Sequence, residues 1–467
     1  MIYRNQILLI VFYWSFAIFC TPLKGITQTT GRVNLFKKQS LTELQQTDLS
    51  PKERNFQPVV GTPVNQNPIL GNDPIEEQNR KMLAAHGMLP GTKQQQLTEL
   101  RTELKQDEVK TQNDIYLAAQ KPFLNNYNEF LKLDPDNFSI TKAIFLTESA
   151  WYDNPPSFDE FNKAIQSRAD LVKAILKREG LDDKNNIAIN YAIQKLYKQE
   201  NQFTDPKTKR VFTVPKLGYD FNDFMGEKNW ANMFVTKLLI TGKGQCHSLP
   251  LLYLAMAEKL RAKAYLSLSP QHSFIQFFDK NGYRYNFETT NGNLVTQTWM
   301  MQSTYINATA LKNQTYLDTL SSRRLYAQIL SDLLMNYTIK LGYDPTSTAM
   351  ANKILSIDKN NVIALMSLAN VYTFIARDKL KQAGNPPANQ LSNYPEANEA
   401  YQNMQRSYEL IEQTGFQDMP KEDYQRWLKT IDEEKKRQKN IEVQQQLKKE
   451  IERVKKLKFV IIDKTRN

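Results

Sequence analysis

One stretch of the chain, "TGKGQCHSLPLLYLAMAEKL" at residues 241–260, restricts the fold more than any other. From Leu249 to Leu260 the apolar residues cover most of the circumference of a helix, and a helix with almost no polar face is buried. Pro250 fits within the first turn, where its missing amide donor costs little. We therefore predict a helix at the centre of a domain, with other elements packed around it.

The sequence on either side of this helix changes from a helical to a strand-like period. Two helices are predicted within residues 158–198, separated at Gly180, and a further helix, "NWANMFVTKLLITGKGQC", ends at Gly242. After the central helix, "KAYLSLS", "HSFIQFF" and "YRYNFETT" predict strands. Helices followed by antiparallel strands indicate an α+β fold.

From about residue 316 onward the sequence is helical in character. The stretch "YDPTSTAMANKILSIDKNNVIALMSLANVYTFIA" predicts two helices across a polar turn, and "YPEANEAYQNMQRSYELIEQ" predicts a further helix. The helix lengths, the small residues Ala364 and Ala369 and the "IDKNN" turn resemble tetratricopeptide repeats. That resemblance implies a helical groove able to hold a protein partner.

The N-terminus predicts export. Ile7 to Cys20 is an apolar run that follows Arg4, is too short to span a membrane comfortably and leads into polar sequence. Cleavage near Gly25 is expected, and a lipid on Cys20 is the second interpretation because Phe19 is bulky where a small residue is usual. We expect a periplasmic or extracellular protein, with association with the envelope as a further option and no transmembrane segment after signal removal.

The net charge of +12 is weak support for a nucleic-acid partner. Much of the positive charge lies in the segment from Lys429 to Lys458, where glutamates interrupt the lysines, so a solvated helix face is expected and no nucleic-acid surface. The chain has no Walker loop, no dinucleotide fingerprint and no paired CxxC motif. We therefore expect no cofactor.

Only two cysteines occur, Cys20 and Cys246. Export removes or modifies Cys20, so the mature chain keeps one thiol, which cannot form an internal disulfide. A leftover cysteine in an oxidising compartment indicates intermolecular pairing or a reactive thiol. The alternative is a buried cysteine that packs as a small hydrophobe.

The surroundings of Cys246 favour a nucleophile. The glycines at 242 and 244 allow a sharp turn and a close backbone approach. Cys246 then lies at the start of the buried helix, where the helix dipole favours a negative charge. A thiol pKa of ~8.5 falls at such a position or beside a protonated histidine, and the thiolate is the reactive form.

The base must be one of three histidines, His86, His247 and His272. His86 lies in the polar lead-in. His247 adjoins Cys246, but successive helical residues point about 100° apart, which makes direct pairing awkward. His272 opens a strand shortly after the helix and is the better candidate.

The third residue follows from the register of the hairpin. A three-residue loop that ends at Gly282 pairs Asp279 with Tyr283 and places His272 opposite Thr290. Glu288 is then the diagonal neighbour on the same face, ~7–8 Å away between backbones and within side-chain reach.

Other roles near the thiol stay open. Asn286 shares the face of His272 but lies two residues farther along. Gln245 is a candidate for an oxyanion hole through its side chain or backbone, with the Cys246 amide as the alternative donor. A metal site made by the cysteine, His247, His272 and Glu288 lacks a recognisable ligand spacing, so no metal is expected.

"GKGQC" at a helix start, a histidine on a strand and an acid on the next strand resemble the transglutaminase-like superfamily of cysteine amidases and acyltransferases, whose core is papain-like. "NWANMFVTKLLITGKGQCHSLPLLYLAMAEKL" followed by "SPQHSF" is most similar to its compact bacterial branch. The resemblance implies that Cys246 is the nucleophile, His272 the base and an acidic or amide residue the orienter. Glu288 fits this last role and Asn286 stays open; a protein or peptide is the expected substrate. The alternative is a non-catalytic scaffold of the envelope that keeps the same fold.

This resemblance sets the expected division of the chain. The expected segments are a signal peptide (1–25), a polar lead-in with a helix (26–115), a transglutaminase-like domain (116–310), a tetratricopeptide-like helical domain (311–430) and a charged helical tail (431–467).

Overall fold

The computed structural model describes residues 41, 93–205, 208–304 and 306–416. The predicted signal peptide with Cys20, most of the polar lead-in with His86, and the predicted charged tail lie outside the described residues. Within the described ranges, no helix is long and apolar enough to cross a membrane.

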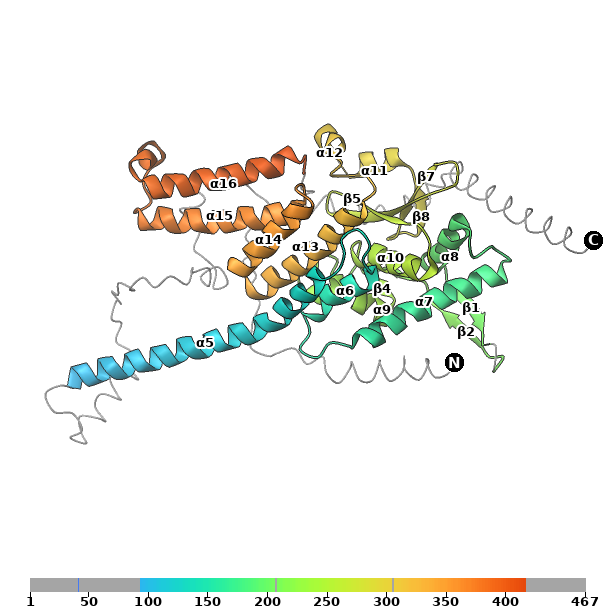
Figure 1. Cartoon of the computed structure of the whole chain (residues 1–467), viewed down its shortest axis with the longest axis horizontal. Coiled ribbons are helices and arrows are strands. Elements are labelled where there is room, and N and C mark those ends of the chain that lie inside the picture. Colours follow the sequence, from blue (N-terminus) through green and yellow to red (C-terminus); the bar gives the residue numbers. More distant parts are fainter. Residues whose placement is uncertain (1–40, 42–92, 206–207, 305, 417–467) are drawn as a thin grey trace, which may run out of the picture.

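The described residues form helices, a four-stranded antiparallel sheet and two two-stranded sheets, so the predicted α+β class is confirmed (Figure 1). The elements up to the central helix are α5 (Lys93–Leu131), α6 (Ile140–Ser149), α7 (Phe158–Arg178), α8 (Asn186–Lys198), β1 (Asn201–Thr204), β2 (Val211–Val214), β3 (Gly218–Tyr219), η1 (Trp230–Met233), α9 (Val235–Thr241), β4 (Lys243–Gly244) and α10 (Ser248–Leu260). The elements that follow are β5 (Tyr265–Ser269), β6 (His272–Phe278), β7 (Arg284–Glu288), β8 (Asn293–Val295), α11 (Gln297–Ser303), α12 (Ala308–Lys312), α13 (Ser322–Leu341), α14 (Pro345–Ile357), α15 (Val362–Gln382), η2 (Ala388–Asn393) and α16 (Pro395–Gln413).

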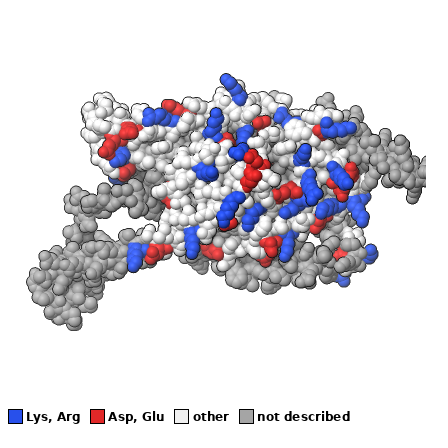
Figure 2. Space-filling model, in the orientation of Figure 1, with Lys and Arg blue, Asp and Glu red and all other residues white. Residues whose placement is uncertain are grey.

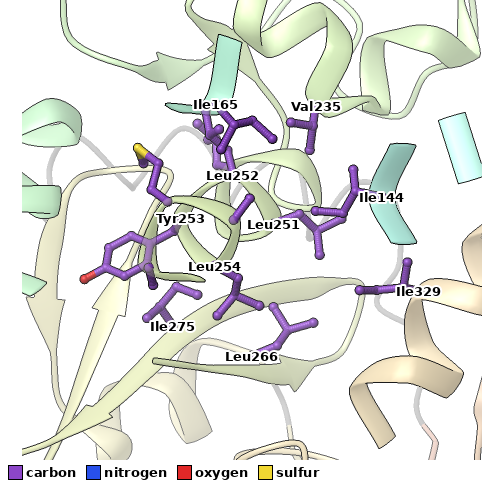
Figure 3. Packing of buried hydrophobic residues seen from close by; sticks show 14 of the residues in the cluster. Ile144, Ile165, Val235, Leu251, Leu252, Tyr253, Leu254, Leu266, Ile275 and Ile329 are labelled. Atoms are coloured by element: carbon purple, nitrogen blue, oxygen red, sulfur yellow. The ribbon is translucent and has the colours of Figure 1, made fainter. Parts of the chain in front are cut away.

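Helix α10 is the central helix that the sequence predicts. All of its residues are buried except Glu258 and Lys259. It packs against α6, α7, α8 and α9 and against strands β5 and β6. Figure 3 shows Leu251, Leu252, Tyr253 and Leu254 pointing in different directions from this helix into the surrounding elements. The helix is therefore enclosed on its whole circumference.

Two glutamates connect the helices around α10 by capping helix starts. Glu258 of α10 accepts hydrogen bonds from the backbone amides of Ile140 and Thr141, at 2.8 and 3.0 Å, at the start of α6. Glu148 of α6 in turn accepts the amides of Val235 and Thr236, at 2.6 and 2.8 Å, at the start of α9. A carboxylate at a helix N-terminus satisfies free N–H groups and interacts favourably with the helix dipole.

The second cap explains a difference from the sequence prediction. The predicted single helix over "NWANMFVTKLLI" is wrong, because the chain is extended at Phe234 (φ −91°, ψ 147°) between η1 and α9. Glu148 accepts hydrogen bonds from the backbone amides of Val235 and Thr236, so a new helix begins after Phe234. The predicted end of this helix is confirmed: Gly242 is its C-cap, with φ 68°.

The predicted hairpin register is confirmed in the sheet, whose order is β5-β6-β7-β8 with all neighbours antiparallel. The Asp279 amide donates to the Tyr283 carbonyl oxygen at 3.1 Å, and Gly282 has φ +80°. The ladder continues with Phe278 opposite Arg284. This is the three-residue loop on which the position of Glu288 depends.

Both faces of the sheet are covered. Ile275, Phe277 and Phe287 pack into the main core with α10. Phe274, on the other face of β6, packs with Val295 and with residues of the segment from α11 to Leu317. Since side chains alternate along a strand, His272 and Glu288 belong to the face of Phe274.

The hydrophobic core continues into the C-terminal helices. Buried residues of α13, among them Ile329 and Leu333, belong to the same cluster as α10, so the packing is continuous across the expected domain boundary at residue 310. A second cluster lies between α15 and α16, where Leu41, the one described residue before Lys93, packs against it. The predicted helices α14, α15 and α16 are confirmed, and their likeness to a repeat stays a prediction.

Gly292 and Gly282 test the packing of the sheet. Both have positive φ, +71° and +80°, but a Cβ atom at Gly292 would lie 2.9 Å from the Tyr197 carbonyl oxygen, whereas one at Gly282 meets nothing within 4 Å. We expect Gly282→Ala to lower the free energy of unfolding by about 1–2 kcal/mol through backbone strain. Gly292→Ala should cost about 1–3 kcal/mol more because the backbone of α8 must shift. Urea unfolding measures both, and equal losses would contradict this packing.

Candidate active site

Cys246 lies in the turn that leads into the central helix, just before the N-cap residue His247. The Leu249 amide donates to the Gln245 carbonyl oxygen at 3.0 Å, so the helical hydrogen bonds begin one residue before the cysteine. The Cys246 side chain is buried, with 6% of the residue exposed. Its sulfur lies 3.7 Å from the Gln271 carbonyl oxygen, at the turn between β5 and β6.

The glycines before the cysteine have different tasks. Gly242 provides the positive φ that ends α9. Gly244 provides space, because a Cβ atom there would lie 2.7 Å from Ser248 Oγ and 3.1 Å from the Leu238 side chain. That Ser248 oxygen accepts the Gln245 amide at 2.9 Å. The turn that carries Cys246 is therefore tightly packed on both sides.

Strand β6 is fixed to this turn at its first residues. Ser273 Oγ donates to the Cys246 carbonyl oxygen at 2.7 Å. Gln271, just before the strand, has φ +53°. A side-chain-bearing residue at positive φ stores strain, and such residues concentrate at functional sites. Neither the hydrogen bond of Ser273 nor the positive φ of Gln271 is predictable from the sequence, because both depend on where the β5–β6 turn meets the helix.

The structure brings His272 and Glu288 into direct contact. His272 Nε2 lies 2.6 Å from Glu288 Oε2, and the two side chains are 1% and 0% exposed. The other carboxylate oxygen, Oε1, accepts the Thr290 amide at 2.9 Å and the Thr290 hydroxyl at 2.7 Å. Both oxygens of this buried carboxylate are thus hydrogen-bonded, which is the condition for keeping a charge out of water.

This contact favours the charged form of both groups. Burial lowers the pKa of His272, but the charge of Glu288 and hydrogen bonds to Cys246 and Glu288 outweigh it, and the net result is a pKa well above the ordinary value. Burial raises the pKa of Glu288, but the charge of His272 and hydrogen bonds from His272 and Thr290 hold it below the ordinary value. The side chains of Cys246, His272 and Glu288 therefore interact in a chain.

The side chains of Gln245 and Asn286 make hydrogen bonds to groups other than Cys246, His272 and Glu288. Gln245 Nε2 donates to the carbonyl oxygens of Asp220 and Asp223, at 3.0 and 3.3 Å, and so attaches the segment before η1 to the turn that carries Cys246. Asn286 accepts from Gln276 at 3.0 Å and donates to the Val295 carbonyl oxygen at 3.3 Å. Both residues support the backbone near the site in this arrangement.

His247 points to a different partner. Its Nε2 lies 3.2 Å from Asp332 Oδ2 on α13. The sequence favours His272 over His247 as the base, because adjacent helical residues point in different directions. The sequence does not predict Asp332 as the partner of His247. A pair formed across so many residues leaves no local pattern in the sequence.

These residues form no metal cluster in the part of the chain described. No group of three or more His, Cys, Asp or Glu side chains there is arranged to hold a metal ion. A cavity of about 420 Å³ lies elsewhere, between the start of α8 and the β6–β7 turn. Its lining consists of Asn185, Asn186, Ile187, Lys263, Tyr265, Phe278, Asp279 and Lys280.

Comparison with known proteins gives no match: neither a family model, nor a curated protein, nor a solved structure is similar to the chain. The interpretation of the site depends on its geometry.

The contribution of Glu288 can be measured at His272. Glu288→Gln removes the negative charge that favours the imidazolium, so we expect the pKa of His272 to fall by at least ~1 unit. Because the folded-state pKa is raised, the stabilisation from this pair is present below the ordinary histidine pKa and is lost as pH rises through the raised value. Histidine NMR titration measures the shift, and the chain has only three histidines to assign. Asn286→Ala is the matched control; an unchanged His272 titration in Glu288→Gln would contradict the assignment.

Proposed function

We propose that the protein is an exported cysteine hydrolase or acyltransferase with a transglutaminase-like core, acting on peptide or carboxamide bonds. The observation that carries the proposal is the buried His272–Glu288 pair at 2.6 Å, in electrostatic contact with a cysteine at the start of the central helix. Nucleophile, base and orienting group are the three parts that covalent acyl transfer needs.

The reaction divides into two steps. The thiolate of Cys246 attacks the carbonyl carbon, and the His272 imidazolium gives its proton to the departing amine, which leaves a thioester on the sulfur. Water then attacks the thioester while His272 takes a proton from that water. The C–S bond breaks, the carboxylic acid is released, and Cys246 returns to the thiolate beside the imidazolium. We favour water over an amine as acceptor, because nothing among the described side chains marks an amine site.

Glu288 has an orienting role in this scheme. Its contact with Nε2 leaves Nδ1 as the nitrogen that serves the sulfur. The carboxylate also stabilises the imidazolium that exists before attack and re-forms in the second step. The amides at the start of α10, among them that of Cys246, are the expected donors to the oxyanion.

The helices after α13 are proposed to hold a protein or peptide partner, with the likeness of α14–α16 to tetratricopeptide repeats as support. On the face in Figure 2, Lys and Arg side chains are interspersed with Asp and Glu. A mixed surface of this kind favours a protein partner over a nucleic acid, whose phosphates select a continuous basic surface.

A second candidate function is a non-catalytic envelope scaffold, and one observation favours it. Cys246 is only 6% exposed, and His272 and Glu288 are fully enclosed. To admit a substrate, an active enzyme with this arrangement must move the residues that bury the Cys246 sulfur. A scaffold needs no such movement.

An activated ester distinguishes the two functions. With p-nitrophenyl acetate we expect a burst of p-nitrophenol stoichiometric with protein and a gain of one acetyl group on Cys246. The Cys20→Ser chain is used, so that Cys246 is the only thiol. Mass spectrometry locates the acetyl group.

Two variants sharpen this experiment. Cys246→Ser should abolish the burst. His272→Gln keeps a hydrogen-bond donor for Glu288 but removes the base, and should slow acylation at pH 7 by about 10²–10⁴-fold. Acylation no faster than that of an ordinary thiol, and unaffected by His272→Gln, would refute the enzyme and favour the scaffold.

A further inference from the structure

His247 is a charged group beside the nucleophile that the proposed reaction does not use. It is the N-cap residue of α10, and its side chain makes no capping hydrogen bond. Instead it reaches Asp332 on α13, with 3.2 Å between Nε2 and Oδ2. The His247 side chain is 31% exposed and that of Asp332 is 11% exposed, so the pair is shielded from water on the side of α13.

Three groups that are negative when ionised face this imidazole from three parts of the fold. They are Asp332 on α13, the Cys246 side chain in the same turn and Glu148 on α6. Burial lowers the pKa of His247, but the charge and hydrogen bond of Asp332 outweigh this effect. Cys246 and Glu148 raise the pKa further, and the result is a pKa of about 9. The imidazole is therefore positively charged at neutral pH.

Glu148 is the weaker partner at neutral pH. Burial raises its pKa to about 7 against its hydrogen bonds from Thr236 and Val235 and the charge of His247. Its contribution therefore fades as pH falls below 7. Asp332, in direct contact with the imidazole, is the main group that favours its charged form.

Asn336 makes a second set of contacts between α13 and the rest of the site. It lies four residues after Asp332, on the same face of the helix. Asn336 Oδ1 accepts Trp230 Nε1 at 2.7 Å, and its Nδ2 donates to the Thr147 carbonyl oxygen at 2.9 Å. One face of α13 thus contacts the nucleophile turn, the segment before α9 and the end of α6. The position of α13 and the position of Cys246 are coupled.

We infer that Asp332 and His247 are positioning residues for the nucleophile: the ion pair holds a second imidazolium beside Cys246 and fixes its turn to α13. The inference rests on the proposed thiolate chemistry. The His272 imidazolium donates the proton in the reaction, while His247 keeps its proton and acts only through its charge and its anchorage.

The test is the pH dependence of Cys246 alkylation by iodoacetamide in the full Cys20→Ser chain. Asp332→Asn removes the charge with almost no change of shape. We expect the midpoint of the profile to rise by about one pH unit, so that alkylation below the midpoint slows about tenfold. Asp332→Glu restores the charge and should return the midpoint toward the starting value. A residue that only stabilises the fold would not shift the midpoint.

Two further variants make the result decisive. His247→Gln should raise the midpoint as Asp332→Asn does, and the double variant should raise it no further, because the two residues act as one unit. His247→Gln also provides the test if Asp332→Asn does not fold. Asp136→Asn is the matched control: it removes a carboxylate that pairs with Arg323 on the exposed start of α13, and should leave the midpoint unchanged.

The outcomes separate this inference from the proposed function. A midpoint that moves in His272→Gln but not in Asp332→Asn or His247→Gln overturns the inference and leaves the proposed function standing. An ordinary thiol titration in the parent chain itself overturns the proposed function, and the inference with it.

Discussion

The burial of α10 is the constraint on which the rest of the structure depends. A helix of 13 residues with only Glu258 and Lys259 outside the core must be surrounded, and four helices and two strands surround it. A rigid, enclosed helix has a fixed first turn, so the residue at that turn is held in place more firmly than a loop could hold it. Even the polar exception takes part, because Glu258 caps α6.

A buried pair of charges lies beside this fixed turn, and it is costly. Burying a carboxylate and an imidazolium is tolerated only where the hydrogen bonds are nearly complete, and removing one partner typically costs about 3–5 kcal/mol. Glu288 meets this condition through His272 and Thr290. Hydrophobic residues of similar volume often stabilise such a position equally well, so stability alone does not account for the pair, and this supports the proposed chemistry at Cys246.

Sequence periodicity predicted the parts of this arrangement that depend on local pattern. Residue types at fixed spacing predicted both the apolar circumference of α10 and the turn at Gly282. That turn sets the strand register, and the register brings Glu288 to His272. The break at Phe234 could not be predicted in this way, because the glutamate that caps α9 comes from a helix far earlier in the chain. The contact between His247 and Asp332 could not be predicted for the same reason, because tertiary packing brings Asp332 to His247 and no pattern in the sequence near His247 indicates it.

The proposed reaction requires that the charged His272, held by Glu288, keeps Cys246 a thiolate at neutral pH. This can be measured by the ultraviolet absorbance of the thiolate as a function of pH, taken as the difference between the Cys20→Ser chain and the same chain with Cys246→Ser. We expect a thiolate signal that persists well below the ordinary thiol pKa of ~8.5. A signal that appears only near that value would show an ordinary buried cysteine and refute the proposed reaction.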